Sequence, residues 1–545
     1  MRPGAVTLGR TPIAGTKGAV AAGHQLAAEV GIDAMRQGGG VVDAVIAAAF
    51  ASFVVEPQMC GIGGHGRMSV WISGQAQAVG IDHFIRAPAG ATPDMYQGAL
   101  ARQGGSAGRI DTTGHLAVGI PGAIAGLETA HRKFGRLPWP ALVDPAIGLA
   151  RQGILAEAPL VAAIAARAAE ISRFPDAASW LLPDGLPPRP TQPGRPGHRF
   201  DLSALAGTLG MIAAQGGAAF YEGALAAAIA RAMGAGGGLV DASDLALYRP
   251  AVFAQPAHRY RRWSYVTCGD LILVECLNIL ERFDLASLGC SSAAGRHLIA
   301  EALAQAFTDN FAHAADPAFG PAPLEGLASK SFAAGMAVRI DPLRAQATIS
   351  AGDPWPHQGA FTGTTQISAM NEAGDAASLI TSLGSAFGSL VLVPETGIFL
   401  GNAMQWFDPR PGHANSVGPG RMPLYAAPVV IVADADGPIG ALGASGGYRI
   451  QTAILHALLN RLDHGLDPQA AIDAPRLHAE GDGLELDARI DAATIEHLRG
   501  FGHRPRLVDG AGWGNPFGRP AAVWRDGSGS LVPASDARAG GVAAY

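Results

Sequence analysis

Apolar residues recur with helical spacing near the start of the chain. The pattern predicts one helix over roughly residues 24–37, ended by the glycines 38–40, and an alanine-rich second helix over about 42–53. A glycine-rich segment then leads into a predicted strand over 68–72. The spacing of apolar residues also predicts a mainly helical middle part, over about residues 115–340.

A proline-rich stretch, PDGLPPRPTQPGRPG at residues 183–197, interrupts this helical part. It predicts a loop that runs over the surface rather than a hinge between domains. Strands follow residue 363, over 364–370, 377–382 and 428–433, with a turn at 371–374. No internal repeat is visible in the sequence.

The segment GALGASGGYRIQTAILHALLNRLDHG, which begins at Gly440, predicts a strand, a glycine turn and a helix. Ile450, Ile454 and Leu458 share one face of that helix, and Gly465 supplies its end. The chain therefore mixes helices and strands throughout.

Composition agrees with a globular chain that buries a sizeable core. Hydrophobic residues make up 48% of the 545 residues, there are 74 glycines, and the mean hydropathy is +0.20. Alanine supplies much of this share and glycine is abundant beside it, so we expect close backbone packing more than bulky aromatic filling. The length leaves one or two domains open.

Charge and the absence of targeting patterns narrow the classes of protein and of partner that the sequence allows. The net charge is −6 and no long lysine or arginine run occurs, so nucleic acid is not an expected partner. The N-terminal segment lacks the apolar core of a secretory signal, and no uninterrupted apolar run of about 18 residues follows. We expect a soluble cytoplasmic protein without a membrane partner.

Cysteine spacing indicates no metal or disulfide framework. Cys60, Cys268, Cys276 and Cys290 form no C-x-x-C pair, and no histidine cluster has the spacing of metal ligands. Four reduced, buried thiols are the expected state, and no metal site is predicted.

Gly61, Gly63 and Gly66 satisfy the G-x-G-x-x-G pattern of dinucleotide-binding folds. That pattern needs a strand before it and a helix after it, whereas this one follows a helix and opens a strand. Nucleotide binding is therefore rejected.

Ser445 is the first candidate nucleophile. Residues 443–447 read G-x-S-x-G between a strand and a helix, and Asp473 and His478 follow in the order of an α/β-hydrolase triad. The parallel strands and upstream oxyanion loop of that fold are not evident, and a glycine turn at a helix start is also a plain tight connection.

Thr364 is the second candidate. If the peptide bond between Gly363 and Thr364 were cut, the new α-amine, with a pKa of about 7.7–8.0, would take the proton from the threonine hydroxyl. Attack of that hydroxyl on the preceding carbonyl needs a contorted, uncrowded backbone, which glycine tolerates best. Gly-Thr-Thr is a common tripeptide, so the surrounding sequence must decide whether Thr364 is a nucleophile.

Several long motifs supply that context. GHQLAAEVGIDAMRQGGGVVDAVIAAAFASFVVEPQMCGIGG, HLAVGIPGAIAGLETAHRKFGRLPWPALVDPAIGLARQG, TTQISAMNEAGDAASLI and GASGGYRI occur in this order between about residues 17 and 480. Together they resemble the γ-glutamyltransferase family. The resemblance implies an N-terminal-nucleophile hydrolase of the α/β class, with four αββα layers in which two sheets lie between helices.

Carried over residue by residue, the resemblance implies that Thr364 is the nucleophile and Ser382 its orienting hydroxyl. Gly446 and Gly447 would be the backbone N–H donors to the oxyanion, at a helix N-terminus suited to that role. Ser445 would then be a loop residue beside the oxyanion hole.

The residues that bind the γ-glutamyl group in the family are not kept. The position of its carboxylate-binding arginine holds Phe84, with Arg86 two residues on; its asparagine after the orienting hydroxyl is Gly384. The positions that bind the substrate amine hold Ala403 and Trp406, and a serine pair is replaced near Tyr425. Local misalignment is the alternative explanation. The full set of expected substrate-binding residues is Phe84, Arg86, Thr365, Gly384, Ala403, Trp406 and Tyr425.

Losing several charge-assisted hydrogen bonds, each worth about 1.5–3 kcal/mol, disfavours a γ-glutamyl zwitterion. The segment MQWFDPRPG resembles instead the acylase and oxamate-amidohydrolase branch of the family. This implies a self-processing threonine amidohydrolase acting on a small amide, with no cofactor. The alternatives are a γ-glutamyl hydrolase or transpeptidase and a ligand-binding scaffold without catalysis.

The expected products of self-cleavage are a large subunit, residues 1–363, and a small catalytic subunit, residues 364–545, in one interleaved unit. The partner of each fragment would be the other, as a heterodimer or a dimer of heterodimers.

Overall fold

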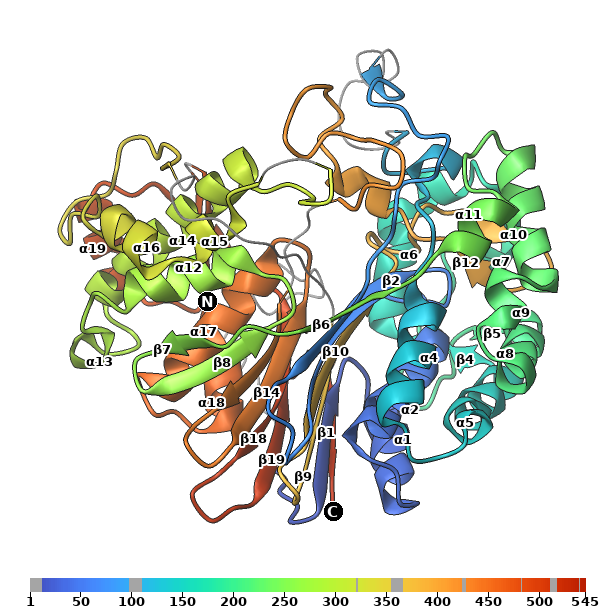
Figure 1. Cartoon of the computed structure of the whole chain (residues 1–545), viewed down its shortest axis with the longest axis horizontal. Helices are drawn as coiled ribbons and strands as arrows, with labels where there is room; N and C mark the ends of the chain where they lie inside the picture. Colours follow the sequence, from blue (N-terminus) through green and yellow to red (C-terminus); the bar gives the residue numbers. More distant parts are fainter. Residues whose placement is uncertain are drawn as a thin grey trace.

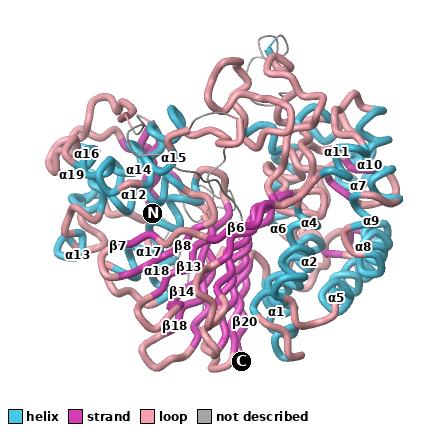
Figure 2. The backbone as a smooth tube through the Cα atoms, viewed as in Figure 1, coloured by secondary structure: helices cyan, strands magenta, loops and turns pink. Residues whose placement is uncertain are grey.

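Two central β-sheets lie face to face between two layers of helices (Figure 1). The computed structural model describes residues 12–97, 110–319, 322–353, 366–423, 428–481, 483–509, 517–538 and 540–545. In Figure 2 the strands gather at the centre of the molecule, and the helices flank them on both sides. The predicted αββα architecture is confirmed.

The first sheet has seven antiparallel strands, and neighbours in it come from distant parts of the chain. In spatial order they are β20 (Gly541–Ala544), β1 (Gly18–Ala22), β9 (Ile367–Asn371), β10 (Ala376–Ser382), β2 (His65–Trp71), β3 (Val79–His83) and β6 (Ala251–Ala254). Strands that follow residue 363 thus lie between strands that precede it.

The second sheet has six antiparallel strands. Their order is β19 (Leu531–Ser535), β18 (Arg519–Arg525), β14 (Pro438–Ser445), β13 (Val429–Ala433), β8 (Trp263–Thr267) and β7 (His258–Tyr260). Three small sheets complete the strands: β15 (Leu477–Glu480), β16 (Gly483–Asp487) and β17 (Pro505–Val508); β11 (Leu392–Val393) and β12 (Ile398–Phe399); β4 (Ile154–Leu155) and β5 (Arg199–Phe200).

Small residues let the two sheets approach closely. The core between them includes Ala19, Ala21, Ala376, Ala441 and Ala521, all buried. Hydrogen bonds also cross this core, since Ser69 Oγ donates to the Val429 carbonyl at 3.0 Å and Ser378 Oγ to the Leu442 carbonyl at 3.2 Å. The alanine-rich composition therefore builds the sheet interface.

One helix layer, on the right in Figure 1, packs on the first sheet. It contains α1 (Gln25–Arg36), α2 (Val41–Val55), α4 (Ala123–Phe134), α5 (Trp139–Gln152), α6 (Ala158–Ile171), α7 (Pro175–Leu181), α8 (Ser203–Gln215), α9 (Ala218–Tyr221), α10 (Ala224–Ala235) and α11 (Ala242–Leu247). Every residue of α2 except Val55 is buried, which explains its continuous apolar sequence.

The other layer packs on the second sheet. It contains α12 (Leu271–Leu280), α13 (Leu285–Leu288), α14 (Ala293–His313), α15 (Leu324–Ala328), α16 (Lys330–Ala337), α17 (Arg449–Leu462), α18 (Pro468–Asp473) and α19 (Ala492–Gly500). Short 3₁₀ turns occur at η1 (His115–Ala117), η2 (Pro183–Gly185) and η4 (Ala403–Trp406).

Most predicted elements agree with the structure. The two early helices are α1 and α2, and the strand, glycine turn and helix around Gly443 are β14 and α17. The prediction of a mainly helical middle missed β6, β7 and β8, which are short strands beside helices and carry weak periodicity. The proline-rich stretch contains only η2 and otherwise runs as a loop.

The prediction of four buried thiols is wrong at one position. Cys60, Cys268 and Cys276 are buried, but Cys290 is exposed, in the turn between α13 and α14. None of the helices within the described ranges is long and apolar enough to cross a bilayer.

Candidate active site

The start of β9 is held against the second sheet by Gln366, the residue just before the strand. Its Oε1 accepts from Ser378 Oγ at 3.1 Å, and its Nε2 donates to Ser368 Oγ and, at 3.4 Å, to the Ala521 carbonyl. Gly443 of β14 faces this amide, and a Cβ there would overlap Oε1. The glycine therefore makes room for the side chain that fixes the beginning of β9. Gly363, Thr364 and Thr365 lie outside the described residues.

Ser382 is the last residue of β10 and is paired with His65 of β2. It is buried, and its Oγ accepts a hydrogen bond from the Gly384 N–H at 2.8 Å. Among the described residues no acceptor takes the Ser382 hydroxyl proton.

Position 384 requires a glycine for two reasons. Its φ is +96°, a left-handed conformation that side chains disfavour, and a Cβ would overlap Oδ1 of Asn402. Asn402 is fully buried; its Oδ1 accepts from the Ser385 N–H and Gln405 Nε2, both at 2.9 Å. Its Nδ2 donates to the Thr112 carbonyl at 2.6 Å. The amide of Asn402 thus fills the space beside Gly384.

Gly446 and Gly447 connect β14 to α17 with φ values of +137° and +62°. Both values lie in the region that favours glycine. Their carbonyls accept from the Arg449 and Ile450 N–H groups at 3.1 Å. Their own N–H groups have no acceptor within the part of the chain that the structure describes. Two adjacent free donors before a helix are suited to bind a negative oxygen.

An aromatic cluster borders this glycine turn. The ring of Trp406, in η4, lies 5.4 Å from that of Tyr448, and the Phe311 ring lies 5.2 Å from that of Tyr448. Phe311 is 50% exposed and Trp406 is half-buried, so the cluster opens toward solvent. Ala403 is fully buried in η4, and Tyr425 lies outside the described residues.

Phe84 and Arg86 follow β3 and differ in their surroundings. Phe84 is buried, its ring lies 4.3 Å from that of His65, and the Arg67 guanidinium lies over it at 5.1 Å. Burial, then the nearby His83 and Arg67, lowers the pKa of His65 to about 3, so this imidazole is neutral at pH 7. Arg86 is partly exposed and forms an ion pair with Asp316 at 3.5 Å.

A small cavity lies near the ends of β9 and β10. It has a volume of about 40 Å³, and Gln366, Thr381, Ser445 and Arg519 are among its lining residues. The volume is sufficient for one or a few water molecules. Water therefore has space beside the strand ends.

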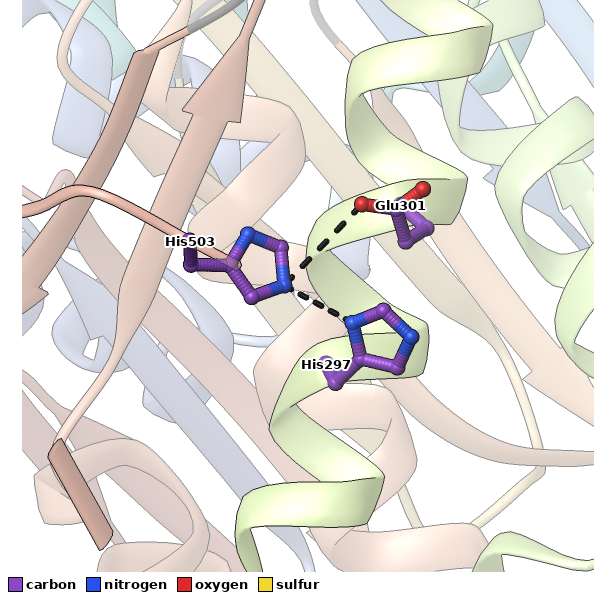
Figure 3. A group of neighbouring side chains, drawn as sticks. All are labelled: His297, Glu301 and His503. Carbon is purple, nitrogen blue, oxygen red and sulfur yellow. Dashed lines mark hydrogen bonds and ion pairs between the residues drawn. The ribbon is translucent and has the colours of Figure 1, made fainter. Parts of the chain in front are cut away.

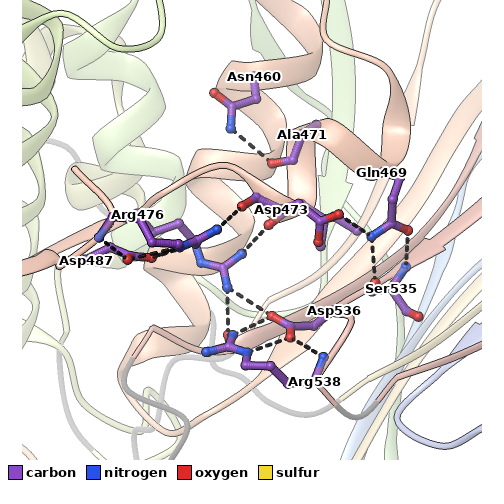
Figure 4. Close-up of polar contacts among 12 residues, drawn as sticks. Asn460, Gln469, Ala471, Asp473, Arg476, Asp487, Ser535, Asp536 and Arg538 are labelled. Carbon is purple, nitrogen blue, oxygen red and sulfur yellow. Dashed lines mark hydrogen bonds and ion pairs between the residues drawn. The ribbon is translucent and has the colours of Figure 1, made fainter. Parts of the chain in front are cut away.

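The Ser445 triad is not formed. His478 Nε2 accepts from Arg449 Nη1 at 2.8 Å, and its Nδ1 is hydrogen-bonded to Thr452 Oγ1 at 2.7 Å. Figure 4 shows Asp473 bound instead by Gln469, at 3.0 Å. The sheet that contains Ser445 is antiparallel, unlike that of an α/β-hydrolase. The strand, turn and helix around Ser445 therefore form the turn at Gly446 and Gly447 rather than a nucleophile elbow.

Sequence reasoning missed Gln366, Asn402 and His65. Gln366 and His65 are neighbours of predicted residues in the strands, but Asn402 lies 18 positions beyond Gly384. Only the fold places that amide next to the glycine, so no local pattern could have indicated it.

Structural comparison places the fold in a known class. Over all of this chain and 99% of the other, the structure is similar to a cephalosporin acylase from Bacillus halodurans, with a TM-score of 0.89 and 28% identity. Two antiparallel sheets between helix layers, with a glycine-built donor pair at one end, define an N-terminal-nucleophile hydrolase, an enzyme that acts on amide bonds.

Sequence comparison gives the family. The family model described as Gamma-glutamyltranspeptidase matches residues 27–545, and the chain belongs to this family. It is 35% identical to Acylase ACY 1 proenzyme of Pseudomonas sp. (strain SE83), over 98% of this chain and 97% of the relative. It is 33% identical to Glutathione hydrolase proenzyme of Pseudomonas sp. (strain A14), over 86% of this chain and 83% of that relative. Both relatives are named as proenzymes.

Proposed function

We propose that the chain is a self-processing N-terminal-threonine amidohydrolase that removes an acyl group from a small amide. Cleavage between Gly363 and Thr364 makes Thr364 the nucleophile. The observation that carries this proposal is the pair of adjacent N–H groups at Gly446 and Gly447, which meet no acceptor among the described residues. Their neighbour Ser445 lines one small cavity with Thr381 and Gln366, at the strand ends.

Chain geometry supports Thr364 as the nucleophile of this site. Gln366 is fixed to the second sheet, and two residues of chain span at most about 7 Å. Ser382 at the end of the adjacent strand offers a hydroxyl proton and is held by the Gly384 N–H. A nucleophile so close to this hydroxyl has an orienting partner within reach.

Self-cleavage begins when the Thr364 hydroxyl attacks the Gly363 carbonyl. The C–N bond breaks, the amine of Thr364 receives the hydroxyl proton, and water hydrolyses the resulting ester. In each later turnover the same hydroxyl attacks the substrate amide while the α-amine takes its proton and passes it to the leaving amine. Gly446 and Gly447 stabilise the oxyanion, and water releases the acid from the acyl-enzyme.

The side chains around the donor turn favour an acyl group without the charges of a γ-glutamyl zwitterion. Trp406, Tyr448 and Phe311 offer aromatic surface beside the donor turn. Arg86, the nearest replacement for a carboxylate-binding arginine, is already paired with Asp316. The acylase relative agrees with this choice; the glutathione hydrolase relative keeps γ-glutamyl hydrolysis as the second candidate.

The first test is self-cleavage. On a denaturing gel with intact-mass analysis, we expect the purified protein to separate into residues 1–363 and 364–545, and Thr364→Ala to remain one chain. Ser445→Ala is the control and should cleave normally. A wild-type chain that stays whole on long incubation, or Thr364→Ala that cleaves as wild type, would contradict the proposal.

The second part of this test uses an amide panel with oxamate, glutaryl amides and γ-glutamyl-p-nitroanilide. We expect cleaved protein to hydrolyse an acyl amide faster than the γ-glutamyl compound. The opposite preference would identify the second candidate, and binding without turnover would identify a scaffold. The cytoplasmic location and the dimer of heterodimers remain predictions.

A further inference from the structure

A cluster of two histidines and a glutamate lies away from the threonine site, on the far side of the second sheet. His297 and Glu301 are four residues apart on α14, which places them on one helix face, and His503 follows α19 (Figure 3). One ligand atom from each side chain lies within 4.8 Å of the others. His503 lies 206 residues beyond His297, so sequence spacing gave no sign of the cluster.

Each side chain is oriented by a second contact. His297 Nε2 lies 2.7 Å from the Asp341 carbonyl, which can only accept, so Nε2 carries the proton of the neutral ring. Its Nδ1 lone pair then points toward His503 Nε2, 2.7 Å away. Glu301 Oε2 accepts from the N–H and Nε2 of Gln346, at 3.3 and 3.0 Å. Its Oε1 faces His503 Nε2 at 3.9 Å.

These contacts match those that support metal ligands. A ligating histidine usually donates its other ring N–H to a carbonyl or carboxylate, and a ligating carboxylate is itself hydrogen-bonded. Tetrahedral zinc with bonds of about 2.0–2.1 Å sets its ligand atoms about 3.3 Å apart. Two of the present separations, 2.7 and 3.9 Å, lie on either side of that value, and all three ligand atoms lie within 4.8 Å of one another. Side-chain shifts of about 1 Å would therefore bring them to the spacing of a zinc site.

The cluster is buried but has access to solvent. His297 and Glu301 are almost fully buried, whereas Glu301 and His503 line a cavity of about 700 Å³. An ion entering from this cavity would keep a fourth position open toward it, as in sites with three protein ligands. Two imidazoles and one carboxylate favour zinc over calcium or magnesium, which prefer oxygen alone.

We propose that His297, Glu301 and His503 bind a divalent zinc ion. On binding, His503 moves its proton from Nε2 to Nδ1 by exchange with water, and Nε2 joins His297 Nδ1 and a Glu301 carboxylate oxygen as ligands. His297 and Glu301 precede the proposed cleavage point and His503 follows it. The ion would thus cross-link two segments that self-cleavage separates, although the site itself does not depend on that cleavage.

Zinc binding by the full-length protein, without a histidine tag, tests the proposal. The protein is stripped with chelator, dialysed against equimolar Zn²⁺ and analysed for bound metal. We expect one zinc per chain, and at least tenfold weaker binding in His503→Gln and in Glu301→Gln. His497→Gln is the matched control, because this exposed histidine on α19 lies outside the cluster.

Cobalt gives a readout that does not depend on these variants folding. Wild-type protein with Co²⁺ should show the intense visible bands of a tetrahedral site, and Zn²⁺ should remove them. Wild-type protein that retains no zinc, zinc binding unchanged in both cluster variants, or only a weak octahedral cobalt spectrum would each overturn the proposal. The result is separate from self-cleavage, since Thr364→Ala should bind the same ion.

Discussion

Gly384→Ala tests whether the asparagine amide beside Ser382 fixes the site. The substitution places a side chain on a backbone with φ of +96°, which costs about 1–2 kcal/mol. The new Cβ also overlaps Oδ1 of Asn402, so the fully buried amide must move. Moving it disrupts bonds to Ser385, Gln405 and Thr112 and leaves at least one buried polar group unpaired, at about 1–3 kcal/mol each.

With one group left unpaired, the combined loss is about 2–5 kcal/mol of unfolding free energy. Gly412→Ala is the matched control, because Gly412 has φ of +80° but open space where the Cβ would be. It should lose only the backbone contribution of about 1–2 kcal/mol. Urea denaturation in a Thr364→Ala background compares the two without interference from self-cleavage.

The same variant tests the link to function. The Gly384 N–H holds Ser382 Oγ, so displacement of this turn should slow self-cleavage in the otherwise wild-type chain, whereas Gly412→Ala should not. In the urea experiment, Gly384→Ala combined with Asn402→Ala should lose less stability than the sum of the two single variants, because the clash is absent from the double variant. If Gly384→Ala loses no more stability than Gly412→Ala, the argument from Asn402 is refuted.

Two further predictions concern the sheet interface and a buried acid. Gly443→Ala should slow self-cleavage, because its Cβ displaces the Gln366 amide that fixes the start of β9. Cleavage at the wild-type rate would contradict this. Burial raises the pKa of Asp270, the N-cap of α12, to about 7, so the native state holds a proton between about pH 4 and pH 7 that the unfolded chain has lost. Wild-type stability should therefore fall across this window relative to Asp270→Asn, by about 2–4 kcal/mol, and parallel urea midpoints from pH 4 to 8 would refute the assignment.

The sequence predicted the elements and the chemistry better than the surroundings of the site. Helical periodicity located α1 and α2, and the glycines at 446 and 447 were expected to form a donor turn before a helix. The resemblance implied that Gly384 stands where the family has an asparagine. In the structure, the side chain of Asn402, from another segment, lies where a side chain at position 384 would be. Such a replacement depends on tertiary packing, which local patterns do not record.

Long-range pairs explain the remaining omissions. The contacts of Gln366 with β14 and β18, and of His297 with His503, join residues far apart in the sequence. The short strands β6 to β8 gain their order from neighbours in the two sheets rather than from their own sequence. Propensity and periodicity describe a segment alone, so they could not supply these contacts.

The interleaved order of the first sheet determines what a cut near residue 363 can do. Strands β9 and β10 lie between β1 and β2, and β20 pairs with the outer side of β1. The two products would share both sheets and the helix layer on the second sheet, so they could not part like docked subunits. Cleavage would act as a nick in one folded body, and exchange of fragments between molecules would be no faster than unfolding. Dilution should therefore leave the pair intact.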